Sequence, residues 1–412
     1  MVTIQKTPFY WHLLFSGFFL FATSNCFYSY IFIDNKLFRI IGLLGILCIF
    51  ISYIHLPKAQ PFTGKWKNLF YFFLAINIIT ILHGIYYPAI PYHSFIMNSS
   101  FMWTYLMPFF LFLKPTPFFI RILFKWCWVY VWFALGFCLY NFSDFYLNPV
   151  EVMRSMIGWD AYYVNRPQEP CNFVLPCCAF LFYFLSFSKK QKILLVFTVT
   201  LALGAALMAG RRSSAATVLC FVLTASCYFY FKSNKKIKII LILLSLIGIV
   251  TYYVDLNIWE EKFEFLLERI DSDTRSGVET DFFKDMTTLS DWIFGRGMSG
   301  TYLSPSAAVI DKLHRTGIET GYLNLILHGG ICLLAPYVLL MSKAVYCGLF
   351  SSCNLLCKVC ATYIGFHIFF LYPSGTPYLS MEYLMLYLFI ALCNSKTWLN
   401  RTNDEIRQRI YF

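Results

Sequence analysis

Charged residues are scarce in this 412-residue chain, where Asp, Glu, Lys and Arg together make up only 13% of the sequence. Hydrophobic residues make up 59% and aromatic residues 20%. A water-soluble chain of this length needs a polar surface that such a composition cannot supply. The scarcity of charge therefore excludes a soluble globular protein and favours an all-α polytopic membrane protein.

Common motifs of nucleotide and metal chemistry are also missing. The sequence contains no P-loop, no nucleophile elbow and no HExxH pattern, so it has no evident nucleotide site, and we expect no cofactor. Cys353, Cys357 and Cys360 have the spacing of a radical iron–sulfur site, but no cytoplasmic domain is present to host one. Most of the 15 cysteines fall in apolar runs, so we expect neither a metal site nor structural disulfides.

The formal net charge of +12 would indicate nucleic-acid binding only if the charges gathered on one surface. Most Lys and Arg residues stand instead in short links between apolar runs. In membrane proteins such basic links face the cytoplasm. The charge therefore indicates membrane topology, and we expect the lipid bilayer, not nucleic acid, as a partner.

Apolar runs long enough to cross a bilayer as helices repeat along the chain. They predict twelve spans, at 9–33, 37–56, 69–88, 101–113, 122–143, 171–188, 193–210, 215–231, 239–254, 321–342, 355–373 and 381–394. The links alternate between basic and Lys- and Arg-poor, which places both termini in the cytoplasm. The fourth and twelfth runs are short, so we expect tilted or partly re-entrant segments there.

One long polar segment divides the chain into three regions. These are helices one to nine over 1–254, a large outer (periplasmic) loop domain over 255–320, and the last three helices with a cytoplasmic tail over 321–412. The 66-residue loop holds 13 acidic residues against 7 Lys and Arg. Its apolar spacing predicts an amphipathic helix within 256–270 and a second helix over 280–294, followed by a Gly-rich hinge.

Arginine residues on the outer face are candidates for an anion site, because the guanidinium group suits phosphate and pyrophosphate. Arg211 and Arg212 form the tight turn between the seventh and eighth spans, against the positive-inside rule. The alternative is contact with lipid phosphates at the interface. Arg275, Arg296 and Arg315 of the loop are further candidates, and for each the alternative is an ion pair with a local carboxylate.

Glu319 stands at the start of the tenth span. A carboxylate there is suited to orient or deprotonate an acceptor hydroxyl, and the alternative is an acid stabilised by the helix dipole. Tyr322 and His314 complete the predicted substrate-binding set, although His314 also suits a solvated loop. His328, further inside the span, suits an interior polar contact as well as catalysis.

These features resemble the superfamily of O-antigen polymerases and O-antigen ligases of bacterial inner membranes. Its members combine many spans, an arginine turn between two central helices and one large periplasmic loop late in the chain. The ligase pattern that opens the following helix begins with histidine. This chain has Glu319-Thr320-Gly321-Tyr322-Leu323 there, with Gly330-Ile331 after it. The stretches GRGMSGTY and IETGYLNLILHGGI look more like the Wzy-type repeat-unit polymerases.

The resemblance implies a GT-C-like enzyme that polymerises undecaprenyl-pyrophosphate-linked oligosaccharides on the periplasmic face. The products would be O-antigen, capsule or exopolysaccharide. It implies catalytic roles for Arg212, Arg275 and Glu319, and pyrophosphate or substrate contacts for Arg211, Arg296 and Arg315. It implies no metal, and a chain-length regulator as the usual protein partner. The alternatives are an O-antigen ligase, against which Glu319 argues, and a flippase or transporter of the same lipid-linked glycans.

Overall fold

The computed structural model describes residues 3–30, 36–85, 98–147, 169–208, 212–232, 275–307, 314–373 and 376–410. These residues are mostly helical. Seven helical segments among them are long and apolar enough to cross a membrane. They are α2 (Lys36–His55), α3 (Lys65–Ile85), α6 (Pro117–Tyr140), α9 (Glu169–Cys178) with η4 (Ala179–Ser186), α10 (Lys189–Met208), α11 (Arg212–Lys232) and α16 (Gly321–Phe350). The described residues thus form a mainly helical membrane protein.

Shorter elements complete the described part of the chain. The apolar ones are α5 (Met102–Leu106) with η1 (Met107–Phe112), α17 (Leu355–Phe369) and α18 (Met381–Cys393). The others are α1 (Thr3–Tyr30), the π-helical turn η2 (Ser143–Leu147), α14 (Ser276–Asp285), α15 (Leu289–Phe294), η5 (Pro305–Ala307), α19 (Lys396–Leu399) and α20 (Asn403–Ile410). The strands β1 (Tyr302–Leu303) and β2 (His314–Arg315) pair antiparallel.

The outward face of α2 shows why these helices suit lipid. Leu43, Leu44, Leu47 and Phe50 are all exposed along it. Such a row of large apolar side chains is unfavourable in water, where each forgoes about 1.5–3 kcal/mol of burial, but it is stable against hydrocarbon.

The predicted spans coincide with helices wherever the structure describes them. The ninth, 239–254, lies outside the described residues, so the count of twelve stays a prediction. The fourth is not one helix, since α5 passes into the tighter turns of η1 near Pro108. The tenth continues beyond its predicted end to Phe350 and contains a break at Gly330.

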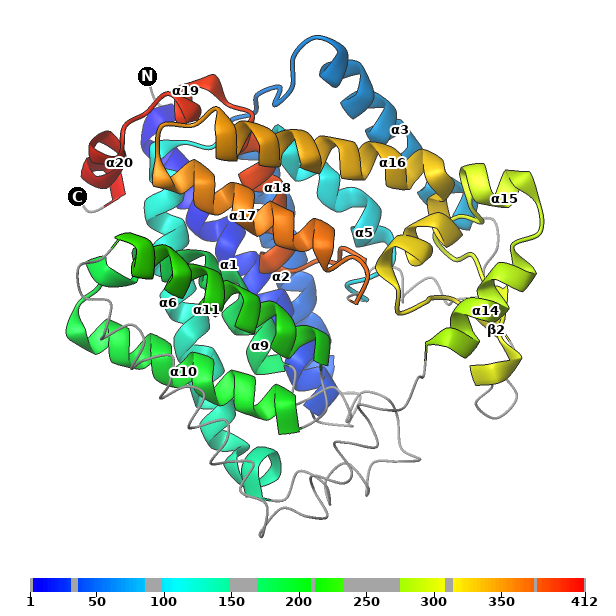
Figure 1. The fold of residues 1–412 in the computed structure, drawn as a ribbon, viewed down its shortest axis with the longest axis horizontal. Helices are drawn as coiled ribbons and strands as arrows, with labels where there is room; N and C mark the ends of the chain where they lie inside the picture. Colours follow the sequence, from blue (N-terminus) through cyan, green and yellow to red (C-terminus); the bar gives the residue numbers. More distant parts are fainter. Residues whose placement is uncertain are drawn as a thin grey trace. The chain divides into compact units, whose positions relative to one another are not determined.

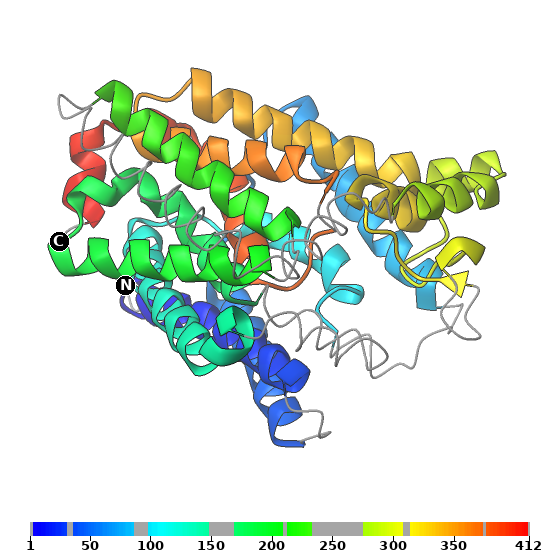
Figure 2. The same ribbon diagram turned by 60° about the horizontal axis from the view of Figure 1, so that its bottom comes forward.

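Contacts divide the chain into two compact units. The first comprises residues 1–24, 36–123 and 273–412, and the second comprises 25–35 and 124–272. In the first unit, α16 packs along α17, α3 and the loop helix α15, and α17 packs along α18 (Figure 1 and Figure 2). In the second unit, α9 packs against α10 and α11. The described part of the large loop belongs to the first unit.

The single helix predicted over 280–294 was wrong, because α14 and α15 are separate. Met286 leaves the helical conformation after Asp285. Thr288 then starts α15, since its hydroxyl oxygen accepts a hydrogen bond from the Asp291 N–H at 3.1 Å. The predicted end of the second helix at Gly295 is confirmed. The amphipathic helix predicted within 256–270 lies outside the described residues.

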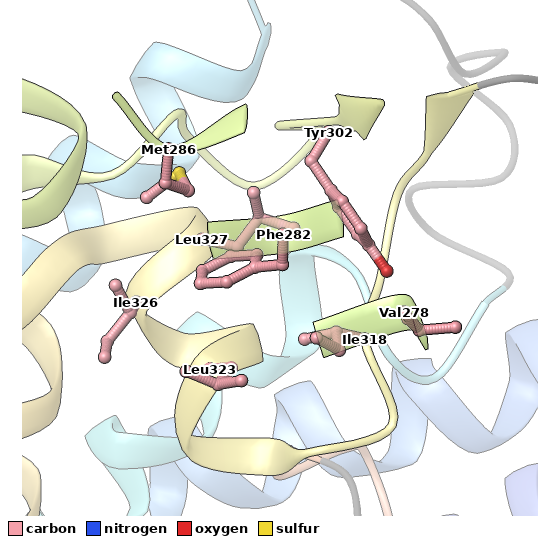
Figure 3. Packing of buried hydrophobic residues seen from close by; sticks show 8 residues of the cluster. All are labelled: Val278, Phe282, Met286, Tyr302, Ile318, Leu323, Ile326 and Leu327. Carbon is pink, nitrogen blue, oxygen red and sulfur yellow. The ribbon is translucent and has the colours of Figure 1, made fainter. Parts of the chain in front are cut away.

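A cluster of buried side chains joins these loop helices to α16 (Figure 3). Phe282 of α14 and Tyr302 of β1 are fully buried and pack toward Leu323 and Leu327 of α16. The other members are Val278, Met286, Ile318 and Ile326. The loop is therefore a packed layer on the end of α16, stabilised by apolar burial.

The Gly-rich stretch predicted as a hinge is instead a packed contact with the break in α16. Gly330 has φ +66, and a Cβ there would clash with the carbonyl of Ile293. Near the break, the carbonyls of Leu327 and His328 accept hydrogen bonds from the N–H groups of Arg296 (2.7 Å) and Gly297 (2.8 Å). The loop backbone thus satisfies carbonyls near the break, as irregular backbone in a membrane helix requires.

Candidate functional site

Arg275 and Glu319 meet where both ends of the described loop approach the membrane helices. Arg275 is the N-cap residue of α14, and Glu319 stands directly before Thr320, the N-cap residue of α16. The Arg275 Nε lies 3.5 Å from the Glu319 Oε2, and the two side chains are 33% and 61% exposed. The pair is therefore accessible to a ligand from solvent.

Further hydrogen bonds hold this pair in place. The Arg275 Nη2 donates to the carbonyl of Pro373 at 3.1 Å. The Thr320 hydroxyl donates to the carboxylate of Glu279 in the first turn of α14. The N-termini of α14 and α16 thus converge with the chain that follows α17. Their partial positive charges and Arg275 together favour an anionic group at this place.

Asn324, in the first turns of α16, connects the Glu319 segment to the chain between α17 and α18. Its Oδ1 accepts from the N–H of Ile318 at 3.2 Å, and its Nδ2 donates to the Thr376 hydroxyl at 3.1 Å. The segment that carries Glu319 is therefore anchored to two neighbouring elements, although the carboxylate itself stays exposed.

An aromatic surface continues from the ion pair. The rings of Tyr322 and Tyr372 lie nearly parallel, with an interplanar angle of 17° and centroids 6.2 Å apart. Tyr372 is exposed and stands next to Pro373, whose carbonyl binds Arg275. Exposed aromatic faces beside a few polar groups suit a ligand with both apolar and hydroxyl-bearing faces.

Arg296 forms ion pairs within the loop, which is the alternative considered for it. Its Nη1 lies 2.5 Å from the Asp285 Oδ2, and its Nη2 lies 2.9 Å from the Asp291 Oδ2. It also donates to the carbonyl of Thr301 at 2.8 Å. Burial opposes the charge, but hydrogen bonds to Asp291 and Asp285 outweigh it and raise the pKa of Arg296. This guanidinium ties α14 to the end of α15.

Arg315 and His314 form the strand β2, opposite Tyr302 and Leu303. Arg315 is half-buried and His314 is exposed. Burial raises the pKa of Tyr302, while the nearby charge of Arg315 opposes that change. Arg315 thus lies close to the phenol of Tyr302, whereas His314 has the solvated position considered for it.

The arginine turn is only partly described. Arg212 is the first residue of α11, but its side chain and all of Arg211 lie outside the described residues. Their predicted roles in an anion site therefore stay predictions.

His328 makes interior polar contacts, the non-catalytic alternative considered for it. Its Nδ1 lies 2.7 Å from the carbonyl oxygen of Asn324, and its Nε2 lies 3.1 Å from that of Thr316. The side chain is buried, with the ring of Tyr105 edge-on at 6.3 Å. It thus connects α16 to the segment that leads into Glu319.

Sequence reasoning missed one pair of ionisable residues, Glu382 and His367. The Nε2 of His367 lies 3.6 Å from the Oε1 of Glu382, and both side chains are buried. The available signal was a glutamate inside the apolar run LSMEYLMLYLF, since a carboxyl group among membrane-span residues is costly.

All 15 cysteines are free thiols. Cys357 and Cys360 are buried in α17, whereas Cys353 is exposed before it. In the described part of the chain, no three His, Cys, Asp or Glu side chains are grouped closely enough to hold a metal ion.

Comparison with known proteins adds no assignment. No family model, no curated protein and no solved structure matches the chain.

Proposed function

We propose that the protein is a polymerase of lipid-linked oligosaccharide repeat units in a bacterial inner membrane. A growing glycan on undecaprenyl pyrophosphate would be transferred to a sugar hydroxyl of a second lipid-linked unit. The energy comes from the pyrophosphate leaving group, in keeping with a sequence that has no evident nucleotide site.

The observation that carries this proposal is the exposed Arg275–Glu319 pair, with Nε and Oε2 3.5 Å apart. It combines a carboxylate, which accepts hydrogen bonds from hydroxyls, with a guanidinium, which binds phosphate oxygens. The exposed ring of Tyr372 next to it adds a surface on which a sugar ring packs.

The proposed step breaks the bond between the anomeric carbon and the pyrophosphate oxygen. A bond forms between that carbon and the acceptor hydroxyl oxygen. Glu319 orients the hydroxyl and accepts its proton, and the negative charge that develops on pyrophosphate is stabilised by Arg275. Arg211 and Arg212 are expected to add to that stabilisation. Arg296 is left out, because Asp285 and Asp291 already bind it.

Deleting the gene and resolving the surface glycan by gel electrophoresis tests the proposal. We expect the ladder of polymer lengths to collapse to single repeat units, and wild-type protein to restore it. Glu319→Gln and Arg275→Ala proteins, present in the membrane at wild-type level, should fail to restore long glycan. Glu405→Gln and Arg407→Ala, which change exposed residues of α20, are matched controls that should restore it.

Other outcomes contradict the proposal. Long glycan that stays on carrier lipid but is absent from the lipid A core indicates a ligase. Loss of glycan of every length from the outer face, with lipid-linked units retained inside, indicates a transporter. Full restoration by Glu319→Gln and Arg275→Ala would show that this pair is not the active site.

A further inference from the structure

The connection between α17 and α18 brings an acid and a base together inside the apolar helices. His367 lies in the last turn of α17, and Glu382 lies in the first turn of α18. The two residues are only 8% and 9% exposed. Their Nε2 and Oε1 atoms are 3.6 Å apart, and the His367 Nε2 makes no hydrogen bond within the described residues.

Among the residues that the structure describes, the surroundings supply polar contacts but no compensating charge. The Tyr378 hydroxyl donates to the Glu382 Oε2 at 3.4 Å, and the Tyr363 hydroxyl donates to the Glu382 carbonyl at 3.1 Å. The ring of His367 packs against those of Tyr363 and Tyr383, at centroid distances of 4.7 Å and 5.3 Å.

The titratable groups of the packed elements support this picture. Those nearest the pair are tyrosines, from α16 (Tyr337), α17 (Tyr363), the connection (Tyr378) and α18 (Tyr383 and Tyr387). The segment η1, which packs on α18, contains no titratable residue. Lysines of the helices stand far along them, Lys343 toward the opposite end of α16 and Lys358 in the first turn of α17.

A buried pair in this setting is stable only when it is neutral as a whole. An ionised carboxylate with a neutral imidazole leaves one negative charge in an apolar site, and a neutral carboxyl with an imidazolium leaves one positive charge. The pair is neutral as a whole in two protonation states. Each of these states has one titratable proton, which is either on the carboxyl or on the imidazole. The helix dipoles favour a carboxylate at the N-terminus of α18 and an imidazolium at the C-terminus of α17. They therefore stabilise the neutral state in which the proton is on the imidazole.

We propose that Glu382 and His367 form a proton-binding site that holds one proton between them. The connection between α17 and α18 links this site to the Arg275–Glu319 pair. Pro373, at the start of the connection, accepts from Arg275, and Tyr378, near its end, donates to Glu382. The proton site is therefore a positioning element for the connection, and its existence does not depend on glycosyl transfer.

Infrared spectroscopy of the full-length protein in lipid nanodiscs tests the proton site. A carboxylic acid C=O band in the wild type that disappears in Glu382→Gln places the proton on the carboxyl. A band absent from the wild type that appears in His367→Gln, and disappears in the double variant, places it on the imidazole. Both results support the site. The control variants His314→Gln and Glu405→Gln, at exposed positions, should leave the carboxylic acid C=O region of the spectrum unchanged.

A Glu382 carboxylate band that is present in both the wild type and His367→Gln, and is lost in Glu382→Gln, would overturn the proposal, since Glu382 would then be ionised without its partner. If Glu382→Gln fails to accumulate, Tyr378→Phe keeps the test decisive. Loss of the Tyr378 O–H donor should shift the infrared band of Glu382, whether that band comes from the acid or from the carboxylate. An unshifted band would contradict the hydrogen bond between Tyr378 and Glu382.

Hydrogen–deuterium exchange of peptides covering 370–380 tests the positioning role. We expect exchange several-fold faster in Tyr378→Phe and Glu382→Leu than in the wild type. Unchanged exchange in both variants would overturn this role. Because this readout involves no glycan, its failure is distinguishable from failure of the proposed polymerase activity.

Discussion

Arg275 and Arg296 lie in the same acidic loop but are held in different ways. Arg296 is three-quarters buried at its side chain and binds two carboxylates, whereas Arg275 shares an exposed contact with Glu319. Exposed ion pairs add little stability, while hydrogen bonds from a buried charge add about 1.5–3 kcal/mol. Residue type alone therefore does not identify the arginine proposed to act in catalysis.

Substituting these two arginines should separate stability from activity. Arg296→Lys should lower the free energy of unfolding by about 1.5–3 kcal/mol, because an ammonium group cannot reproduce the planar guanidinium contacts. Arg275→Lys should leave the thermal unfolding midpoint unchanged but reduce glycan polymerisation. Thermal unfolding in detergent, together with glycan gels, measures both. A stable, inactive Arg296→Lys would contradict the structural role.

Removing the Glu319 carboxylate should slow the proposed reaction more than it changes substrate binding. General base catalysis contributes roughly 10²–10⁴-fold in rate, so Glu319→Gln should lose at least about 10²-fold. Purified protein and lipid-linked acceptor provide the rate measurement. A Glu319→Gln enzyme with wild-type rate would exclude proton transfer to this side chain.

Asp281 should make the loop sensitive to acid. Hydrogen bonds from Ser306, and then from Ser304, lower the pKa of Asp281 below its usual value. A lowered pKa means that the stabilisation is present above the unfolded-state value, about 3.9, and is lost as the pH falls through the lower folded-state value. Asp281→Asn should therefore melt below the wild type at neutral pH, and the two midpoints should converge below about pH 4. A constant difference would contradict this.

At the scale of elements, the broken helix α16 is the feature on which the loop depends. Gly330 allows the Ile293 carbonyl to approach the helix backbone, and Gly295, with φ +70, passes close to His328. Gly330→Ala should cost at least about 1–2 kcal/mol for the left-handed backbone alone, and the clash adds to it.

The matched control for that substitution is Gly365→Ala in α17, where an added Cβ meets nothing within 4 Å. It should be neutral or stabilise by about 0.5–1 kcal/mol, as alanine does inside a helix. Limited proteolysis of the loop, at equal protein levels, compares the variants. Equal protease resistance of Gly330→Ala and the wild type would show that the loop does not need this contact.

At the scale of the whole molecule, hydropathy predicted the helices because a bilayer demands long apolar segments whatever their partners. It did not predict the break at Gly330 or the Glu382–His367 pair, since each depends on contact with another element, and it left the Arg296 ion pair as one of two alternatives. The Arg275–Glu319 pair was only partly foreseen. Both residues were candidates, but nothing in their spacing indicated that they bind each other.

The predicted topology places the acidic loop and the link between α16 and α17 on opposite sides of the membrane. Leu289 is exposed on the loop, and the native Cys353 is exposed in that link. A membrane-impermeant maleimide should therefore label Leu289→Cys on intact spheroplasts, and Cys353 only after the membrane is opened. Labelling of Cys353 from outside would contradict the predicted topology.

The backbone contact at the break in α16 also limits how the sequence can diverge. Leu327 and His328 contribute their backbone carbonyls to it, and their side chains contact the loop as well, Leu327 in the buried cluster and His328 at the Thr316 carbonyl. Gly330 and Gly295 are needed for the absence of a Cβ. Homologues with this architecture should therefore keep both glycines together. A lineage that loses one should lose the other, and with it the whole contact between loop and helix.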